Sequence, residues 1–112
     1  MSDPVTERKE KLVLELRRGV LVLSVLLALR EERYAYVLRK ELVASGIDIE
    51  EGTLYPLLRR IEDQGLLESD WRDADGRRRR YYRLSREGRN VLEDLKDEWT
   101  HLAAAVNALK VD

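Results

Sequence analysis

Guanidinium groups are concentrated in one short stretch of this sequence. Residues 77 to 89 contain seven arginines and one acidic residue, Glu87, in a chain of 112 residues whose formal net charge is −1. Four of the arginines follow the Asp75-Gly76 pair directly, in "DGRRRRYY". A guanidinium presents several N–H donors in a fixed plane, a geometry that suits phosphate. The stretch therefore indicates a local surface for a polyanion, with an ordinary solvated face as the alternative.

A second candidate surface lies in "EEGTLYPLLRRIEDQGLL", residues 50 to 67. Apolar residues at helical spacing predict one buried face: Leu54, Leu57, Leu58 and Ile61. At about 100° per residue, the opposite face and its flanks carry groups that suit base edges and phosphates: Gly52, Thr53, Tyr55, Pro56 and Arg59. Gly52 and Pro56 both weaken a helix. Two helix breakers on one exposed face favour a surface that approaches a partner closely over a kinked helix without one.

The residues needed for catalysis or metal binding are scarce. The chain has no Cys and a single His, His101, which excludes disulfides, thiol catalysis and cysteine metal sites. We expect His101 at the surface or in an interface. No phosphate-binding loop is present, and the acidic pairs Glu62-Asp63 and Asp97-Glu98 each diverge by about 100° on their helices. We therefore expect no enzyme activity, no cofactor and no metal.

The sequence also argues against a membrane protein. The apolar run from Val20 to Leu29 is too short to span a bilayer. The run follows mostly polar residues and lacks a small-residue cleavage site, so it does not fit a signal peptide. We expect a cytoplasmic protein.

Caps and breakers predict the elements that position these residues. A first helix should span residues 4–32, capped by Asp3 with Pro4 at its first position, and its apolar second half predicts burial on more than one side. "YAYVLRKELVASG" predicts a second helix that ends at Gly46. "IEEGTLYPLLRRIEDQG" predicts a third helix that ends at Gly65 and carries the second candidate surface.

The chain changes character after Gly65. The Asp75-Gly76 pair predicts a hairpin of two short antiparallel strands, with a wing at residues 71–82 and Trp71 packed at its base. Ser85 should cap a final helix that runs to about Lys110. The order predicts a mainly α fold with a small β-hairpin. Its parts are a winged helix-turn-helix domain at residues 1–84, including the N-terminal helix, and a long C-terminal dimerisation helix at residues 85–112.

The last helix has a heptad seam of three repeats. Its members are Gly88, Leu92, Leu95, Trp99, Leu102, Val106 and Leu109. The seam can pack against the first helix of its own chain, but its end projects beyond a compact winged domain. We therefore expect a homodimer whose interface runs from Leu92 to Leu109 and is shared by the first helix. Trp99 and its symmetry mate could enclose a planar aromatic ligand, or simply fill the dimer core.

Three segments together resemble the PadR family of winged-helix transcriptional regulators: "EGTLYPLLRRIEDQGLLESDW", "GRRRRYYRLSREGR" and "YAYVLRKEL". The resemblance runs from about Arg18 to Asn107. It implies a homodimeric repressor of the short type, with one C-terminal helix, that binds double-stranded promoter DNA. Some members of the family bind planar drugs or phenolic acids near the dimer interface, which implies a planar aromatic effector as a candidate ligand.

The resemblance also implies roles for individual residues. Thr53, Tyr55 and Pro56 fall in the recognition helix, Tyr36 and Lys40 near the phosphate backbone, and Arg77, Arg78 and Arg79 in the wing. The chain departs from the family pattern in three places. Ala35 stands where a Gly usually separates the two tyrosines, and "EER", residues 31–33, stands where a Gly-Pro commonly precedes them. Glu50 stands where a Ser often caps the third helix. Glu at a helix N-terminus suits the helix dipole but repels phosphate.

A winged-helix module that binds another protein without touching DNA is the alternative function. The clustered wing arginines and Arg59 argue against it. Salt separates the two functions, because each phosphate that a protein neutralises steepens the dependence of log K on log salt by about 0.9.

Overall fold

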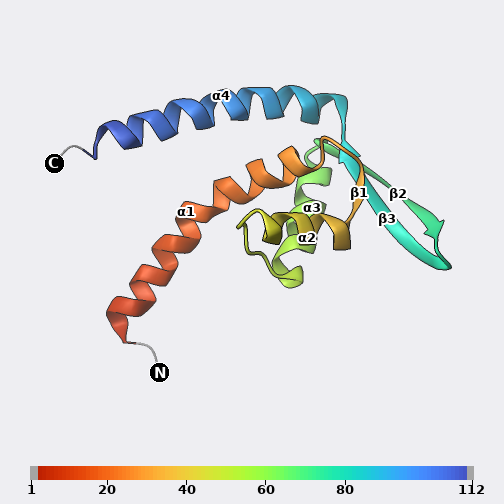
Figure 1. Cartoon of the computed structure of the whole chain (residues 1–112), viewed down its shortest axis with the longest axis horizontal. Coiled ribbons are helices and arrows are strands. Elements are labelled where there is room, and N and C mark those ends of the chain that lie inside the picture. Colours follow the sequence, from red (N-terminus) through yellow and green to blue (C-terminus); the bar gives the residue numbers. More distant parts are fainter. Residues whose placement is uncertain (1–2, 111–112) are drawn as a thin grey trace.

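The computed structural model describes residues 3–110 (Figure 1). Its elements follow one another as α1 (Pro4–Ala28), β1 (Arg33–Tyr34), α2 (Ala35–Ala44), α3 (Glu51–Asp63), β2 (Leu67–Ala74), β3 (Arg77–Leu84) and α4 (Arg86–Ala108). The strands form one antiparallel sheet in the order β1-β3-β2, and the β2–β3 hairpin projects from the helices as a wing (Figure 1). This arrangement confirms the predicted winged-helix fold.

The local signals act as predicted at most element ends. Asp3 and Ser85 cap α1 and α4, because each side chain accepts the N–H three residues further along, at 2.7 and 2.9 Å. The Asp75-Gly76 pair has φ values of 52° and 74°, as a two-residue hairpin turn with two left-handed residues requires. A glycine in the left-handed region follows the end of each of α2 and α3: Gly46 and Gly65, with φ values of 101° and 81°.

The first helix is shorter than predicted, because α1 ends at Ala28 rather than at residue 32. The side chain of Leu29, which follows, is fully buried. Arg33 and Tyr34 then pair with β3 as the short strand β1, which was not predicted. No Gly or Pro marks this helix end, and pairing with the sheet overrides the helix propensity of "LREE".

The core lies where the C-terminal half of α1 meets α2, α3, the sheet and the start of α4. Its largest fully buried side chains are Val25, Leu26, Leu29, Leu38, Leu54, Leu58, Ile61 and Leu92. Tertiary packing of these side chains, more than local propensity, therefore holds the helices in place. The first half of α1 stays outside this core, since Leu12 and Leu16 are 65% and 76% exposed.

The start of α4 docks closely on the corner between α3 and β2. A Cβ at Gly88 would lie 2.0 Å from the carbonyl oxygen of Leu66, so a side chain there must displace the backbone. We expect Gly88→Ala to lower the free energy of unfolding by about 2–3 kcal/mol, measured by urea denaturation.

Gly52→Ala is the matched control for this packing. A Cβ at Gly52 meets nothing within 4 Å, and Ala favours a helix over Gly. The free energy of unfolding should therefore rise by up to about 1 kcal/mol. Equal stabilities of the two variants would contradict the close contact at Gly88.

Candidate nucleic-acid interface

The predicted outer face of α3 is exposed in the structure. Its members are Gly52, Thr53, Tyr55, Pro56 and Arg59, and the opposite face, with Leu54 and Ile61, is buried. Pro56 lies inside the helix, where it has no N–H for the carbonyl of Gly52. Because Gly52 is exposed, solvent or a partner can satisfy that carbonyl. The helix keeps its inner face packed while its outer face remains free.

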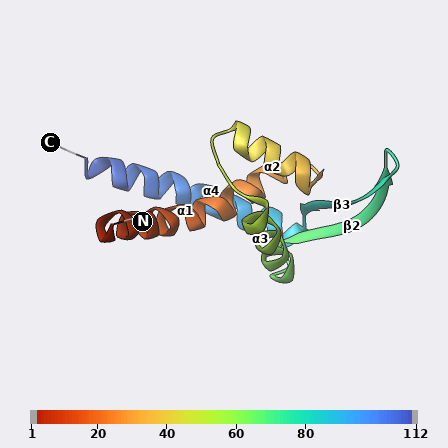
Figure 2. The same cartoon turned by 90° about the horizontal axis from the view of Figure 1, so that it is seen from below.

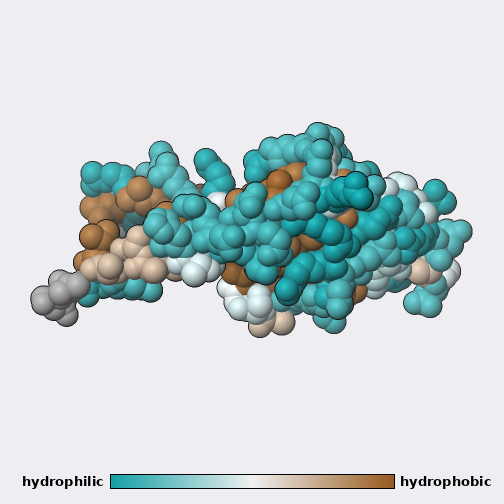
Figure 3. Space-filling view, turned by 90° about the horizontal axis from the view of Figure 1, so that it is seen from above, coloured by the Kyte–Doolittle hydropathy of each residue, from teal (hydrophilic) through white to brown (hydrophobic). Residues whose placement is uncertain are grey.

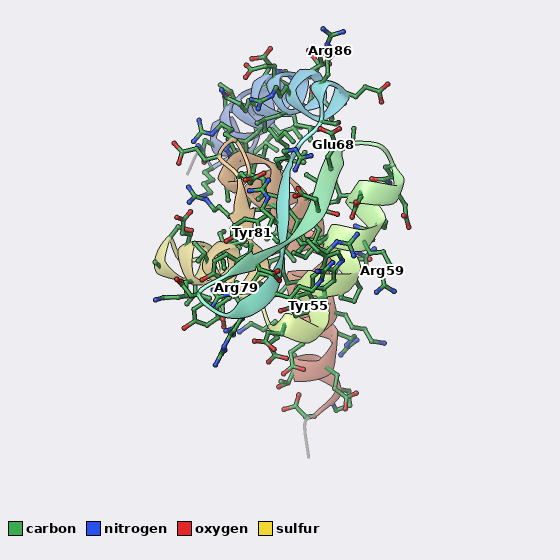
Figure 4. The ribbon with its side chains drawn as sticks, turned by 90° about the vertical axis from the view of Figure 1, so that its right-hand side faces the viewer. Tyr55, Arg59, Glu68, Arg79, Tyr81 and Arg86 are labelled. Carbon is green, nitrogen blue, oxygen red and sulfur yellow. The ribbon has the colours of Figure 1, made fainter. Side chains whose placement is uncertain are left out.

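A cleft of about 760 Å³ lies between α3, the start of α2 and the wing. It brings together six of the predicted site residues: Tyr36, Tyr55, Arg59, Arg77, Arg78 and Arg79. Gly52, Thr53 and Pro56 lie outside its lining. Lys40 borders it, because its Nζ stands 5.6 Å from the ring centre of Tyr36. Figure 4 shows Tyr55, Arg59 and Arg79 in one half of the molecule, with Arg86 at the opposite end.

The four arginines after the hairpin turn are not equivalent. Arg80 is tied to α3, because it donates to Glu62 Oε1 at 3.1 Å and to Ser69 Oγ at 2.9 Å. Ser69 in turn donates to Glu62 Oε2 at 2.6 Å. The preceding arginines, Arg77 to Arg79, form no ion pair within residues 3–110. Their charges therefore remain available to a phosphate.

A second group of charges ties the wing to the corner that follows α1. Glu32 accepts two hydrogen bonds from Arg72, at 2.5 and 2.7 Å, and Arg72 also donates to Asp70 at 2.8 Å. Arg83 donates to Asp70 at 2.6 Å. We call these four residues the ion-pair cluster. It was not predicted, because it joins residues 40 positions apart in the chain and no local pattern marks the helix end before Glu32.

The ion-pair cluster should make the stability of the protein depend on pH. Hydrogen bonds from Arg72 lower the pKa of Glu32 and of Asp70 below their ordinary values. A carboxyl with a lowered folded-state pKa stabilises the fold above its ordinary pKa, and this contribution is lost as the pH falls through the folded-state pKa. Part of the stability present at pH 7 should therefore disappear in acid.

Glu32→Gln tests this expectation. We expect the variant to be slightly less stable than the wild type at about pH 7, and the difference to shrink toward about pH 3, in urea denaturation at each pH. The effect should be small because the carboxyls are partly exposed. Glu93→Gln, which removes a surface pair with Lys96, is the control. Parallel pH profiles for wild type and Glu32→Gln would contradict a role for the cluster.

Trp71 is 53% exposed and is not packed at the base of the wing as predicted. It lies opposite Arg80 on the hairpin, and the guanidinium carbons of Arg78 and Arg80 are each 5.8 Å from the centre of its ring. The core covers only the first part of β2, where Leu67 is buried, and the hairpin then leaves the helices (Figure 1). Trp71 is therefore a surface residue of the candidate interface.

The heptad seam of α4 divides into a buried and an exposed part. Leu92 is 2% exposed and belongs to the core of its own chain, so it has no surface to offer to a second copy. This corrects its place in the predicted dimer interface: the start of the seam packs within the chain. Leu95 is partly buried against the same core. The rest of the seam is exposed: Trp99 at 48%, Leu102 at 49%, Val106 at 55% and Leu109 at 84%.

An apolar groove of about 850 Å³ lies between α1 and the exposed part of this seam. Both helices lie on the side of the sheet away from the wing, and the distance between them grows toward the two chain ends (Figures 1 and 2). The lining includes Leu16, Val20, Leu23, Leu95, Trp99, Leu102 and Val106. Figure 3 shows hydrophobic residues at the surface of the end farthest from the wing. The groove is therefore a second candidate interface, distinct from the cleft.

Two further properties concern residues 3–110. None of their helices is long and apolar enough to cross a membrane. No group of three or more acidic or histidine side chains in this range is placed to hold a metal ion. His101 is exposed on α4.

Several known proteins are similar to this chain in sequence and in fold. Residues 22–94 match the family described as the Transcriptional regulator PadR-like family. The chain is 44% identical over 69 residues to the transcriptional regulator Rv3488 of Mycobacterium tuberculosis, which covers 62% of this chain and 64% of that regulator. A crystal structure of a PadR family transcriptional regulator from Eggerthella lenta is 45% identical, with a TM-score of 0.83 over 96% of this chain and 97% of that one. A PadR-like regulator from Bacillus cereus is 31% identical, with a TM-score of 0.80 over 88% of this chain and 99% of that one.

Proposed function

The chain belongs to the PadR-like family of transcriptional regulators, and from that premise we propose that it is a homodimer that represses transcription from a promoter. Members of the family are DNA-binding regulators rather than enzymes, and this chain is one of them. In the proposal, residues 1–84 form the DNA-binding domain, residues 85–112 the dimerisation helix, and the protein works in the cytoplasm.

In the proposed complex, α3 enters the major groove of double-stranded DNA, and the wing at residues 71–82 contacts phosphates or the minor groove. The observation that carries this proposal is the cleft in which Tyr55 and Arg59 of α3 face the wing arginines Arg77 to Arg79. Arg59 can reach a guanine edge, whereas the wing arginines suit phosphates. Base contacts and backbone contacts would therefore come from two elements on one side of the molecule.

A second copy of the chain would close the groove between α1 and α4. Monomeric proteins rarely leave a large contiguous apolar surface in water. Leu102 and Val106, on a heptad seam, and Leu16, on the facing helix, are the kind of side chains that another helix covers. A two-fold symmetric dimer would place its two DNA-binding domains about 34 Å apart on one face of the duplex.

The position of Trp99 supports the proposal that a planar aromatic effector binds at the dimer interface. Its ring is 48% exposed in the apolar groove. Two copies of the ring that face each other across the dimer axis could hold a flat aromatic molecule between them. An effector that changes the angle between the two α4 helices would change the distance between the two DNA-binding domains. The domains would then no longer match their two half-sites, and the operator would be released.

Arg59→Ala tests the proposed function at α3. We expect affinity for the operator duplex to fall about 10-fold or more and base preference to relax, because a bidentate arginine–guanine pair is worth about 1–3 kcal/mol. Fluorescence anisotropy with operator and mixed-sequence duplexes measures both effects. Arg86→Ala is the control, since it removes an equal charge at the opposite end of the molecule (Figure 4). Unchanged affinity and base preference for Arg59→Ala would remove Arg59 from the reading face.

A further inference from the structure

Aromatic rings, rather than carboxylates, hold two cations on the cleft side of the molecule. The guanidinium carbon of Arg79 lies 4.3 Å from the ring centre of Tyr34, and Lys40 Nζ lies 5.6 Å from that of Tyr36. Neither cation forms an ion pair within the described chain. The arginines of the ion-pair cluster, in contrast, are bound to carboxylates.

Tyr34 connects these two cations. Its ring stacks on that of Tyr36, with the ring centres 6.5 Å apart and the planes 14° from parallel. It also meets the ring of Tyr81 edge-on, at 5.5 Å between centres, and its backbone pairs with Tyr81 in the sheet. As the last residue of β1, directly before α2, Tyr34 links the second helix to the wing.

We propose that Tyr34 is a positioning residue that holds Arg79 and, through Tyr36, Lys40 in place for the phosphates of bound DNA. This inference rests on the proposed function. A carboxylate partner would order a cation but would also cancel its charge and occupy its N–H donors. The negative face of a ring orders the cation and leaves its charge and most of its donors free. Side chains that are already ordered lose less conformational entropy when they bind a phosphate.

The electrostatics of this ring can be changed with little change in its shape. Tyr34→Phe keeps the negative ring face and should retain most of the affinity for a mixed-sequence duplex of about 30 base pairs. Tyr34→pentafluorophenylalanine reverses the charge pattern of the ring and should weaken binding by about 3- to 10-fold relative to Tyr34→Phe. Thermal unfolding of both variants establishes that each is folded at the temperature of the titration.

A double-variant cycle shows whether Tyr34 acts through Arg79. In an Arg79→Ala background, the difference in log Kd between the two ring variants should be less than half of the difference measured with Arg79 present. Equal affinities of the two ring variants, or an equal difference in both backgrounds, would overturn the proposal. Failure of the wild type to bind the duplex at low salt would instead contradict the proposed function itself.

Discussion

Leu102→Glu is expected to separate the proposed dimer into monomers and to lower affinity for operator DNA by about 100-fold or more. Leu102 is 49% exposed in the groove, in the middle of the exposed seam. Burial of a leucine contributes about 1.5–3 kcal/mol, and a two-fold interface contains each change twice. A carboxylate without a partner in such an interface adds several kcal/mol of desolvation cost. A monomer also loses the avidity of two linked DNA-binding domains, which raises the overall affinity by about 10²- to 10⁴-fold.

Sedimentation equilibrium measures the oligomeric state of this variant, and anisotropy titration measures its affinity for DNA. Ala104→Glu is the matched control, because Ala104 is exposed and lies two residues, or about 200°, around α4 from Leu102. The control should remain a dimer. A Leu102→Glu protein that still sediments as a dimer would place the interface elsewhere, on the exposed first half of α1.

Removal of the wing-tip arginines is expected to produce the second large effect. Arg77, Arg78 and Arg79 form no ion pairs within residues 3–110, so their substitution by alanine leaves no carboxylate without its partner. If each one neutralises a phosphate, the triple variant should reduce the slope of log K against log salt by about 2.7 per wing, at about 0.9 per contact. Base preference should persist, because phosphate contacts position a protein and base contacts specify the sequence.

Titrations with the same duplex at several salt concentrations measure this slope. The control combines Arg86→Ala with Arg89→Ala, two exposed arginines in the first turn of α4. These substitutions should change the slope little, because Arg86 lies at the end of the molecule opposite the cleft (Figure 4). A triple wing variant with the slope of the wild type would show that the wing does not neutralise phosphates.

The elements with local signals were predictable from the sequence. Gly46 and Gly65 mark the ends of α2 and α3, the Asp75-Gly76 pair marks the hairpin turn, and Ser85 marks the start of α4. Each of these signals acts through backbone conformation or a hydrogen bond within a few residues. The strand β1 and the early end of α1 were not predictable, because they depend on pairing with β3, almost 50 residues away.

The same distinction holds at the candidate site. The outer face of α3 follows from helical periodicity, and it is exposed as predicted. Periodicity does not show which wing arginines are neutralised, because Glu62 and Glu32 reach Arg80 and Arg72 through the fold. It likewise could not show that Leu92 is covered by its own chain while the rest of the seam is exposed. Residue types predicted the chemistry of the surface, but only the tertiary structure shows which arginines are paired with carboxylates.

The most direct test of a sequence-specific, DNA-binding repressor is a titration of the purified protein against the promoter DNA upstream of its own gene. Random duplex serves as the competitor, and the titration is repeated at several salt concentrations. We predict tighter binding to the promoter than to the competitor, with a steep fall in affinity as salt rises. The same assay can then screen planar aromatic molecules for release of the DNA. Absent binding, or weak binding that salt does not change, would contradict a DNA-reading function and favour a winged-helix module that binds another protein.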